Sequence, residues 1–212
     1  MRFMISPLNL VDEKVLKEIE KKVKIIDVIG KGHRGIVFKG IYKGKLVAVK
    51  VMRKDSPKNT IRHEAEILKM LEEYKFSPKV YFYSDIYLVM EYINGVELKK
   101  IINSLSKEEI LKVVEQILKI SLRLDSLGIE HGEIQGGRHF LVAKDRVYII
   151  DFDKSRVKRT TKNFTSAISL LFGDNLIANR VKEALNLEEE DILFIRRLAK
   201  LYKRSGNYGT KS

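Results

Sequence analysis

The sequence predicts an α+β protein made of two lobes, the first rich in strands and the second mainly helical. Three short β-branched segments, 23–29, 36–41 and 46–52, follow one another with glycine-bearing turns between them. This pattern is typical of an antiparallel meander. Beyond Asn94-Gly95 the apolar residues recur mainly at helical spacing. We therefore expect an antiparallel sheet in the first lobe and helices in the second.

Further elements are expected in the first lobe. Apolar residues at helical spacing around Asp12 predict a short leading helix. Residues 59–74 have the same period, and two more strands are expected at 79–83 and 86–91. The predicted regions are an N-terminal helical extension at 1–22, a first lobe at 23–93 and a second lobe at 94–212.

In the second lobe, Ser106 and Glu109 form a capping box at the start of a long helix, which Gly128 closes. A small hairpin is expected over 140–150, and the remainder, 164–204, is predicted to be helical.

Composition narrows the class of protein. The chain has 212 residues, of which 44% are hydrophobic, and this excludes a disordered tail. Cysteine is absent, which excludes disulfides and thiolate metal sites and fits a cytoplasmic location. No signal peptide or membrane-spanning run is evident, so no membrane association is expected. The net charge of +13 favours polyanionic partners such as nucleotides, RNA, ribonucleoprotein or acidic proteins.

A glycine-rich segment follows the first expected strand. Gly30, Gly32, Gly35 and Val37 fit the pattern G-x-G-x-x-G-x-V. A dinucleotide-binding fingerprint needs a strand followed by a helix, whereas these glycines lie between two β-branched segments and indicate a hairpin. Such a hairpin either folds over phosphates with its backbone amides or only supplies the conformations of a tight turn.

Lys50 ends the apolar segment Val47-Ala48-Val49-Lys50. A lysine inside an apolar strand must reach solvent or find an anion. On the strand after the glycine hairpin it is placed to reach phosphates under that loop, and Glu64 on the next helix is a natural ion-pair partner. The alternative is an ordinary surface pair.

The segment 87–98 joins the two lobes, and its extended backbone has groups that can hydrogen-bond a purine edge. Glu97, at the start of the following helix, either takes a ribose hydroxyl or stabilises the helix dipole.

Two carboxylates stand out in the second lobe. Asp151 follows an apolar strand, and oxygen ligands in such a place hold Mg²⁺ that bridges nucleotide phosphates. Glu133, on a loop before a hairpin, is placed for general-base work on a hydroxyl. Taken alone, Glu133 would be a solvated loop residue and Asp151 a turn former.

In their order and approximate spacing these pieces resemble the signature set of the protein kinase family, over about residues 29–153. The resemblance implies a two-lobed protein-kinase-like fold with an antiparallel-sheet N-lobe and a reduced helical C-lobe. It implies ATP with Mg²⁺ or Mn²⁺ as cofactors, Lys50 as phosphate clamp, Glu133 as base or orienting group and Asp151 as metal ligand. The nucleotide site that it implies comprises Gly30, Gly32, Gly35, Val37, Ala48, Lys50, Glu64, Met90 as gatekeeper, Glu91 and Tyr92 as hinge residues, and Glu97.

The metal ligands depart from the family pattern. Arg138 stands where the family has an asparagine as second ligand, and arginine cannot ligate Mg²⁺. Either His139 or Gln135 replaces it, or one metal suffices, or turnover is lost. Asp153 stands where glycine is usual and is a further candidate ligand beside Asp151.

The catalytic loop departs too, because His131-Gly132-Glu133 stands where His-Arg-Asp is usual. The missing arginine argues against regulation through a phosphorylated activation loop. A chain this short lacks room for the peptide-binding half of a regulatory kinase. It resembles the compact atypical kinases, namely the RIO family, the small kinase of the tRNA-threonylcarbamoyl-modifying complex and the lipopolysaccharide kinases.

These features predict an ATP–Mg²⁺-dependent atypical serine/threonine kinase or ATPase. Arg138 and Glu133 motivate the alternative of a nucleotide-binding pseudokinase that serves as an interaction module. A third hypothesis is a small-molecule kinase that acts on a sugar or lipid hydroxyl, which the basic charge makes less attractive.

Two basic clusters lie outside these motifs. They either dock on RNA or a ribonucleoprotein, or are only solvated faces. One comprises Lys154, Arg156, Lys158, Arg159 and Lys162. The other is a face of the last helix with Arg196, Lys200, Lys203 and Arg204, while Ile192, Ile195, Leu198, Ala199 and Tyr202 are expected to pack elsewhere.

Overall fold

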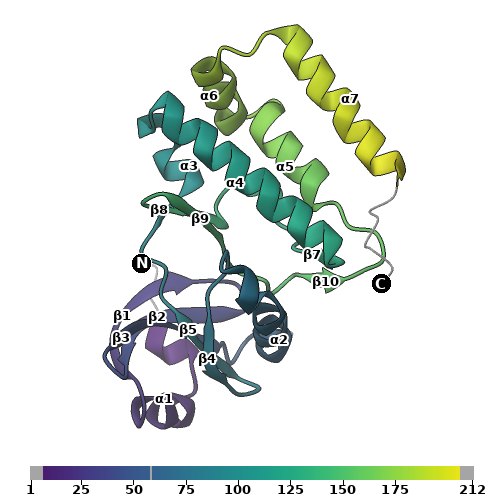
Figure 1. Cartoon of the computed structure of the whole chain (residues 1–212). Coiled ribbons are helices and arrows are strands. Elements are labelled where there is room, and N and C mark those ends of the chain that lie inside the picture. Colours follow the sequence, from purple (N-terminus) through teal and green to yellow (C-terminus); the bar gives the residue numbers. More distant parts are fainter. Residues whose placement is uncertain (1–6, 58, 206–212) are drawn as a thin grey trace, which may run out of the picture. The chain divides into compact units, whose positions relative to one another are not determined.

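A computed structural model of the chain describes residues 7–57 and 59–205. The chain divides into two compact units, Met1–Ile93 and Asn94–Ser212 (Figure 1). The first contains a five-stranded antiparallel sheet and the second is mainly helical. The predicted two-lobed α+β fold class is therefore confirmed.

The sheet of the N-terminal unit has the strand order β1-β2-β3-β5-β4, with antiparallel neighbours throughout. Its strands are β1 (Lys24–Lys31), β2 (Gly35–Tyr42), β3 (Lys45–Met52), β4 (Val80–Tyr83) and β5 (Tyr87–Glu91). Helix α2 (Ile61–Leu71), followed by a 3-10 turn at Glu72–Tyr74, connects β3 to β4. All of these elements were expected from periodicity, to within a few residues at their ends.

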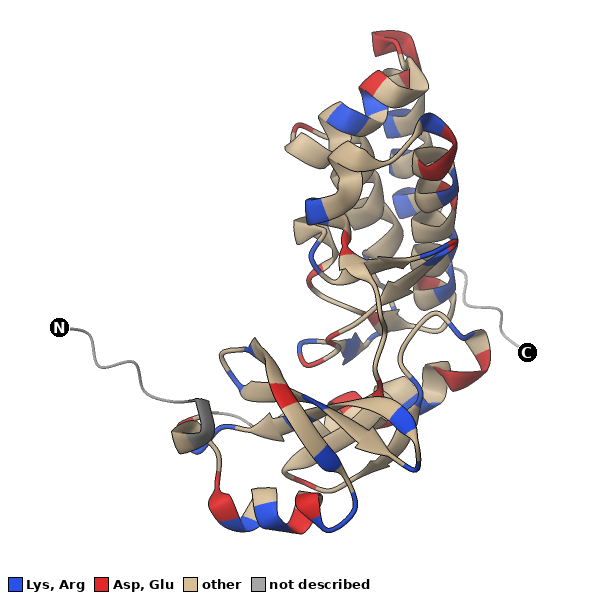
Figure 2. Ribbon diagram, turned by 90° about the vertical axis from the view of Figure 1, so that its left-hand side faces the viewer, with Lys and Arg blue, Asp and Glu red and all other residues tan. Residues whose placement is uncertain are grey.

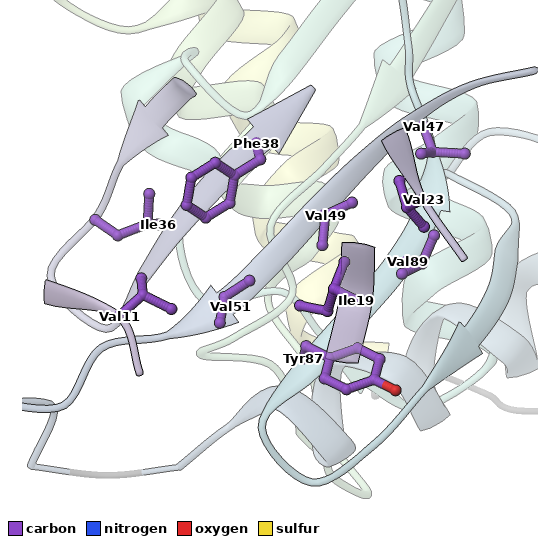
Figure 3. Close-up of a cluster of buried hydrophobic side chains, with 10 residues drawn as sticks. All are labelled: Val11, Ile19, Val23, Ile36, Phe38, Val47, Val49, Val51, Tyr87 and Val89. Atoms are coloured by element: carbon purple, nitrogen blue, oxygen red, sulfur yellow. The ribbon is translucent and has the colours of Figure 1, made fainter. Parts of the chain in front are cut away.

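The leading helix belongs to the core of this unit. A 3-10 turn at Pro7–Leu10 precedes α1 (Glu13–Glu20), whose first turn is capped because the Asp12 carboxylate accepts a hydrogen bond from the Lys14 amide at 2.9 Å. Ile19 of this helix is buried against one face of the sheet. The cluster, drawn in Figure 3, comprises Val11, Ile19, Val23, Ile36, Phe38, Val47, Val49, Val51, Tyr87 and Val89.

The C-terminal unit is built around α4 (Lys107–Ser126), which opens with the predicted Ser106–Glu109 capping box. It ends just before Gly128, whose φ of 67° is one that glycine adopts without strain. Helix α5 packs against α4, α6 and α7. The helices of this unit are α3 (Leu98–Ile101) with a 3-10 turn at Ile102–Ser104, α4, α5 (Asn163–Phe172), α6 (Leu176–Leu185) and α7 (Glu189–Ser205).

Two small sheets complete this unit. The predicted hairpin is β8 (Phe140–Ala143) and β9 (Arg146–Ile149), and β6 (Val96–Glu97) adds to it. The Gln116 amide of α4 holds the hairpin, because it accepts from the Val147 amide and donates to the Asp145 carbonyl, both at 2.9 Å. Strands β7 (Ile129–Glu130) and β10 (Arg156–Val157) form the second sheet.

The packing predicted for the last helix is wrong at Leu198, whose exposed fraction is 47%. Ile192 is buried and Ile195, Ala199 and Tyr202 are half-buried. These four are spaced i, i+3, i+7 and i+10 and form one stripe toward the unit, whereas Leu198 lies beside that stripe with the exposed Phe194 and Leu201. Within residues 7–57 and 59–205, no helix has the length and apolar character to cross a membrane.

Candidate functional site

One face of the N-terminal sheet carries the apolar residues predicted to contact a nucleotide. Val37 pairs with Lys50 across β2 and β3, and Ala48 pairs with Met90 across β3 and β5. Side chains alternate between the two faces of a strand, and directly paired residues share a face. These four side chains therefore lie on the face opposite to the cluster of Figure 3.

The glycine segment forms a hairpin between β1 and β2, so the dinucleotide-binding alternative is wrong. Its turn is closed by a hydrogen bond of 2.9 Å from the Gly32 amide to the Gly35 carbonyl, and Arg53 donates to the Gly32 carbonyl at 3.1 Å. A Cβ on Gly35 would lie 3.4 Å from Lys50 Cγ and 3.0 Å from the Val51 carbonyl oxygen. The bare backbone at Gly35 therefore leaves room for the lysine side chain.

Lys50 and Glu64 form a buried ion pair. Lys50 Nζ lies 2.7 Å from Glu64 Oε2, and the two side chains are only 8% and 0% exposed. Glu64 is presented by the first turn of α2. The alternative of an ordinary surface pair is therefore wrong, and the predicted partner of Lys50 is the one that the structure has.

The predicted hinge residues use their amides within the N-terminal unit. The Glu91 amide donates to the Lys79 carbonyl at 2.8 Å, and the Tyr92 amide donates to the Leu46 carbonyl at 3.4 Å. Because these two amides are already used, hydrogen bonds from this segment to a purine would come from backbone groups other than the amides of Glu91 and Tyr92.

Glu97, in β6 of the C-terminal unit, precedes α3 but makes no side-chain cap. Its carboxylate instead accepts from Lys100 Nζ at 2.7 Å.

His131 fixes the loop that carries Glu133. Its side chain is fully buried, and this burial lowers its pKa from 6.5 to about 4. The neutral ring donates from Nε2 to the Ile150 carbonyl at 3.0 Å and accepts at Nδ1 from the Glu133 amide at 3.3 Å. Its ring also meets Phe152 edge-on, at 4.8 Å between centroids. His131 thus ties the backbone of Glu133 to the strand end that precedes Asp151.

Asn163 and Asp125 anchor His131 in turn. Asn163 Oδ1 accepts from the His131 amide at 2.9 Å, and its Nδ2 donates to Asp125 Oδ1 at 2.8 Å. Asp125 is 2% exposed. Its carboxylate accepts hydrogen bonds from Thr161 Oγ1, the amide and Nδ2 of Asn163, the Phe164 amide and the Tyr202 hydroxyl. Neither residue was predicted from the sequence, although an aspartate at the end of the apolar face of α4 was a signal for a buried, hydrogen-bonded carboxylate.

Glu133, His139 and Asp151 come together in the C-terminal unit. Each offers one ligand atom, and these three atoms lie within 4.8 Å of one another. Asp151 has a φ of 67°, which few residues other than glycine adopt. Of the alternative ligands, Gln135 is exposed, and Asp153 is not a member of this described set.

Lys154 sets the charge state of Glu133. Partial burial would raise the pKa of this carboxyl, but the hydrogen bond from Lys154, at 2.7 Å, and the charges of His139 and Lys154 outweigh it, so the pKa lies below its usual value. Glu133 is therefore ionised at neutral pH, and this suits a base or an orienting acceptor.

A cavity of about 320 Å³ lies beside Glu133. Arg138, Lys162, Asn163 and Ser166 also line it. Within the described part of the chain, neither Arg138 nor Lys162 is paired with an acid. The cavity thus places two available cations close to an ionised carboxylate.

The basic cluster after Asp151 is partly neutralised. Lys154 pairs with Glu133, and Lys158 pairs with Glu130 at 2.6 Å. Basic and acidic residues occur on both units (Figure 2). Two of the five basic residues of this cluster are therefore paired with acids, and its role in RNA docking stays a prediction.

Comparison with known proteins identifies the class. Residues 23–172 match the family described as "Protein kinase domain". The chain belongs to the protein kinase family, and its fold and motif order agree with this assignment. The finer resemblance to the RIO family and the other compact kinases stays a prediction.

Two relatives illustrate the range of similarity. The chain is 59% identical over 115 residues to the uncharacterized protein MJ1211 of Methanocaldococcus jannaschii, which covers 54% of this chain and 99% of that protein. It is 28% identical over 192 residues to the probable serine/threonine-protein kinase fnkE of Dictyostelium discoideum, which covers 76% of this chain and 14% of that protein.

Proposed function

We propose that this chain is an atypical serine/threonine kinase or ATPase that uses ATP with Mg²⁺ or Mn²⁺. In this reaction the acceptor oxygen bonds to the γ-phosphorus, the bond from that phosphorus to the β,γ-bridging oxygen breaks, and the acceptor proton passes to a base. Membership of the protein kinase family supports this class of reaction.

The observation that carries the proposal is the buried Lys50–Glu64 ion pair. Two charges removed from water contribute little net stability, and an apolar pair of similar size often serves stability as well or better. The arrangement makes sense when the lysine has to be held in place for an anion. The adjoining glycine hairpin, which leaves room for the Lys50 side chain at Gly35, supports nucleotide phosphates as that anion.

The remaining roles follow from the C-terminal unit. Asp151 is proposed as the metal ligand, and Glu133 as the base or orienting group for the acceptor hydroxyl. When bound, the metal would neutralise charge on the phosphates. His131, Asn163 and Asp125 act as positioning residues for this loop, because they hold it through the hydrogen bonds described above.

The cavity beside Glu133 supports an anionic partner. Arg138 and Lys162 line it without acidic partners in the described residues, so a hydroxyl next to a phosphate would meet two positive charges there. RNA is the docking partner that we favour. A neutral sugar hydroxyl would make less use of these charges.

The test is phosphate transfer from γ-labelled ATP by the full chain, with Mg²⁺ or Mn²⁺, to protein, RNA and water. Lys50→Ala and Asp151→Asn should each abolish label transfer and phosphate release. Lys45→Ala, on the same strand but exposed, and Asp145→Asn, in the exposed hairpin turn, are matched controls that should leave activity unchanged. Equal activity in all five proteins would refute catalysis by this site. Thermal stabilisation by ATP without turnover would instead favour the pseudokinase.

A further inference from the structure

We propose that Glu133, His139 and Asp151 form a three-ligand site for a divalent first-row transition ion, which it prefers to Mg²⁺. This inference rests on the proposed function for its biological use, because the metal would be the one that accompanies the nucleotide. The site itself is defined by the side chains of the C-terminal unit alone.

The distances between the ligand atoms suit a metal better than hydrogen bonds. His139 Nε2 lies 3.6 Å from Glu133 Oε2, and His139 Nδ1 lies 3.8 Å from Asp151 Oδ2. Both separations exceed the range of a normal hydrogen bond. Two ligand atoms held about 2.1 Å from one metal are separated by about 3.0–3.4 Å. Because His139 can offer only one ring nitrogen to a metal, and the three ligand atoms lie within 4.8 Å of one another, the side chains have to draw closer together to complete the site.

His139 is the second observation that points to a ligand. The residue is 8% exposed, and its buried Nε2 has no hydrogen-bond partner among the described residues. Such a nitrogen loses its hydrogen bond to water on burial and gains no replacement. A bond from either ring nitrogen to a metal, after the ring has reoriented, would remove this cost. The backbone holds the residue in place, since the His139 carbonyl accepts from the Ile150 amide at 2.9 Å.

The Glu133 carboxylate can bind the metal without losing its other partner, and of the two roles proposed above it then keeps that of an orienting group. Its Oε1 accepts from Lys154 Nζ at 2.7 Å, while Oε2 is the oxygen that faces His139. The two carboxylates supply two negative charges for a divalent ion. The hydrogen bond from Lys154 also orients the carboxylate in the way that outer partners orient metal ligands elsewhere.

The ligand types decide the preference. Mg²⁺ favours oxygen ligands and keeps much of its water, whereas imidazole nitrogen favours first-row transition ions. An asparagine at the position of His139 would offer only an oxygen. The histidine therefore shifts the site away from Mg²⁺ and toward ions such as Mn²⁺ or Co²⁺.

The experiment measures metal binding by the full chain in the absence of nucleotide. Mn²⁺ and Mg²⁺ are titrated by isothermal calorimetry, and bound Mn²⁺ is counted by electron paramagnetic resonance. We expect one site that binds Mn²⁺ at least about tenfold more tightly than Mg²⁺, and His139→Asn should weaken Mn²⁺ binding at least about tenfold, as loss of a ligand does. His139→Ala should weaken it as much. The exposed His33→Asn is the matched control and should bind Mn²⁺ as the unaltered chain does.

Three results would overturn the inference. These are an unchanged Mn²⁺ affinity in His139→Asn, equal affinities of the unaltered chain for Mn²⁺ and Mg²⁺, and no metal binding without nucleotide. The ATP assay separates this inference from the proposed function. Turnover with Mg²⁺ but no His139-dependent Mn²⁺ site would remove only the inference, and a His139-dependent site without turnover would remove only the proposed function.

Discussion

Removing the negative charge of Glu64 should destabilise the protein much more than removing both charges of its ion pair. Glu64 is fully buried and the Lys50 side chain is 8% exposed. Glu64→Gln keeps the shape of the side chain but removes the negative charge that lies 2.7 Å from the buried Lys50 ammonium. Breaking a buried pair in this way costs about 3–5 kcal/mol, and because the amide oxygen can still accept from Lys50 we expect about 3 kcal/mol.

The double variant Lys50→Met/Glu64→Leu removes both charges of this pair. Apolar replacement of a whole buried pair is often neutral or stabilising, so we expect it to regain at least about 2 kcal/mol relative to Glu64→Gln. Stability is measured from urea unfolding followed by circular dichroism, with the free energy of unfolding extrapolated to water. The double variant should nevertheless fail to transfer phosphate, because it lacks the proposed phosphate contact.

An exposed pair of the same unit provides the control. Lys79 and Glu72 lie 3.0 Å apart with side chains 57% and 38% exposed. Glu72→Gln should change the free energy of unfolding by less than about 1 kcal/mol. The reasoning is refuted if Glu64→Gln costs no more than Glu72→Gln, or if the double variant is less stable than Glu64→Gln.

Three further predictions concern other contacts. The pKa of His131 is about 4 in the folded protein and 6.5 as its usual value. As the pH falls, the unfolded chain therefore takes up a proton at this histidine before the folded protein does. The contribution of His131 to the free energy of unfolding is complete above pH 6.5 and falls, by about 3 kcal/mol in all, as the pH drops toward 4. Imidazole ¹⁵N shifts should show a neutral ring at pH 6, and a protonated ring there would contradict the burial argument. Asp125→Asn places an amide NH2 group where at least two donors now find an oxygen. Urea unfolding should therefore show a loss of about 3 kcal/mol, against about 1.5 kcal/mol for Tyr202→Phe, which removes one hydrogen bond. The affinity for poly(U) RNA should fall with salt, and the slope of log affinity against log salt should become shallower by about 1.4 when Arg138 and Lys162 are both changed to alanine. An affinity that does not change with salt would exclude phosphate contacts.

The sequence was informative wherever a pattern repeats over several turns or strands. The meander of β1 to β3 and the capped helix α4 follow from periodicity and caps. Strands β6, β7 and β10 did not, because each has two residues and two residues carry no period. Their existence depends on partners more than twenty residues away in the chain.

Some residues of the candidate site could be predicted from the sequence and others could not. The Lys50–Glu64 pair could be predicted because both residues fall in regular elements of the kinase signature. The choice between Gln135 and His139 could not be made by counting along the chain. It depends on how the 3-10 turn at Ile134–Gly136 and the left-handed Gly137 lead into β8, which buries His139 and leaves Gln135 exposed.

The helices at the two ends of the chain have a consequence for work with fragments. The family match covers residues 23–172, but Val11 and Ile19, buried in the sheet's core, precede it, and Ile192 and Tyr202 of α7 follow it. A fragment trimmed to the match would leave one face of the sheet uncovered and would take a donor from Asp125. We expect such a fragment to aggregate on expression. We therefore expect the stretch that folds to extend beyond the stretch that matches the family on both sides.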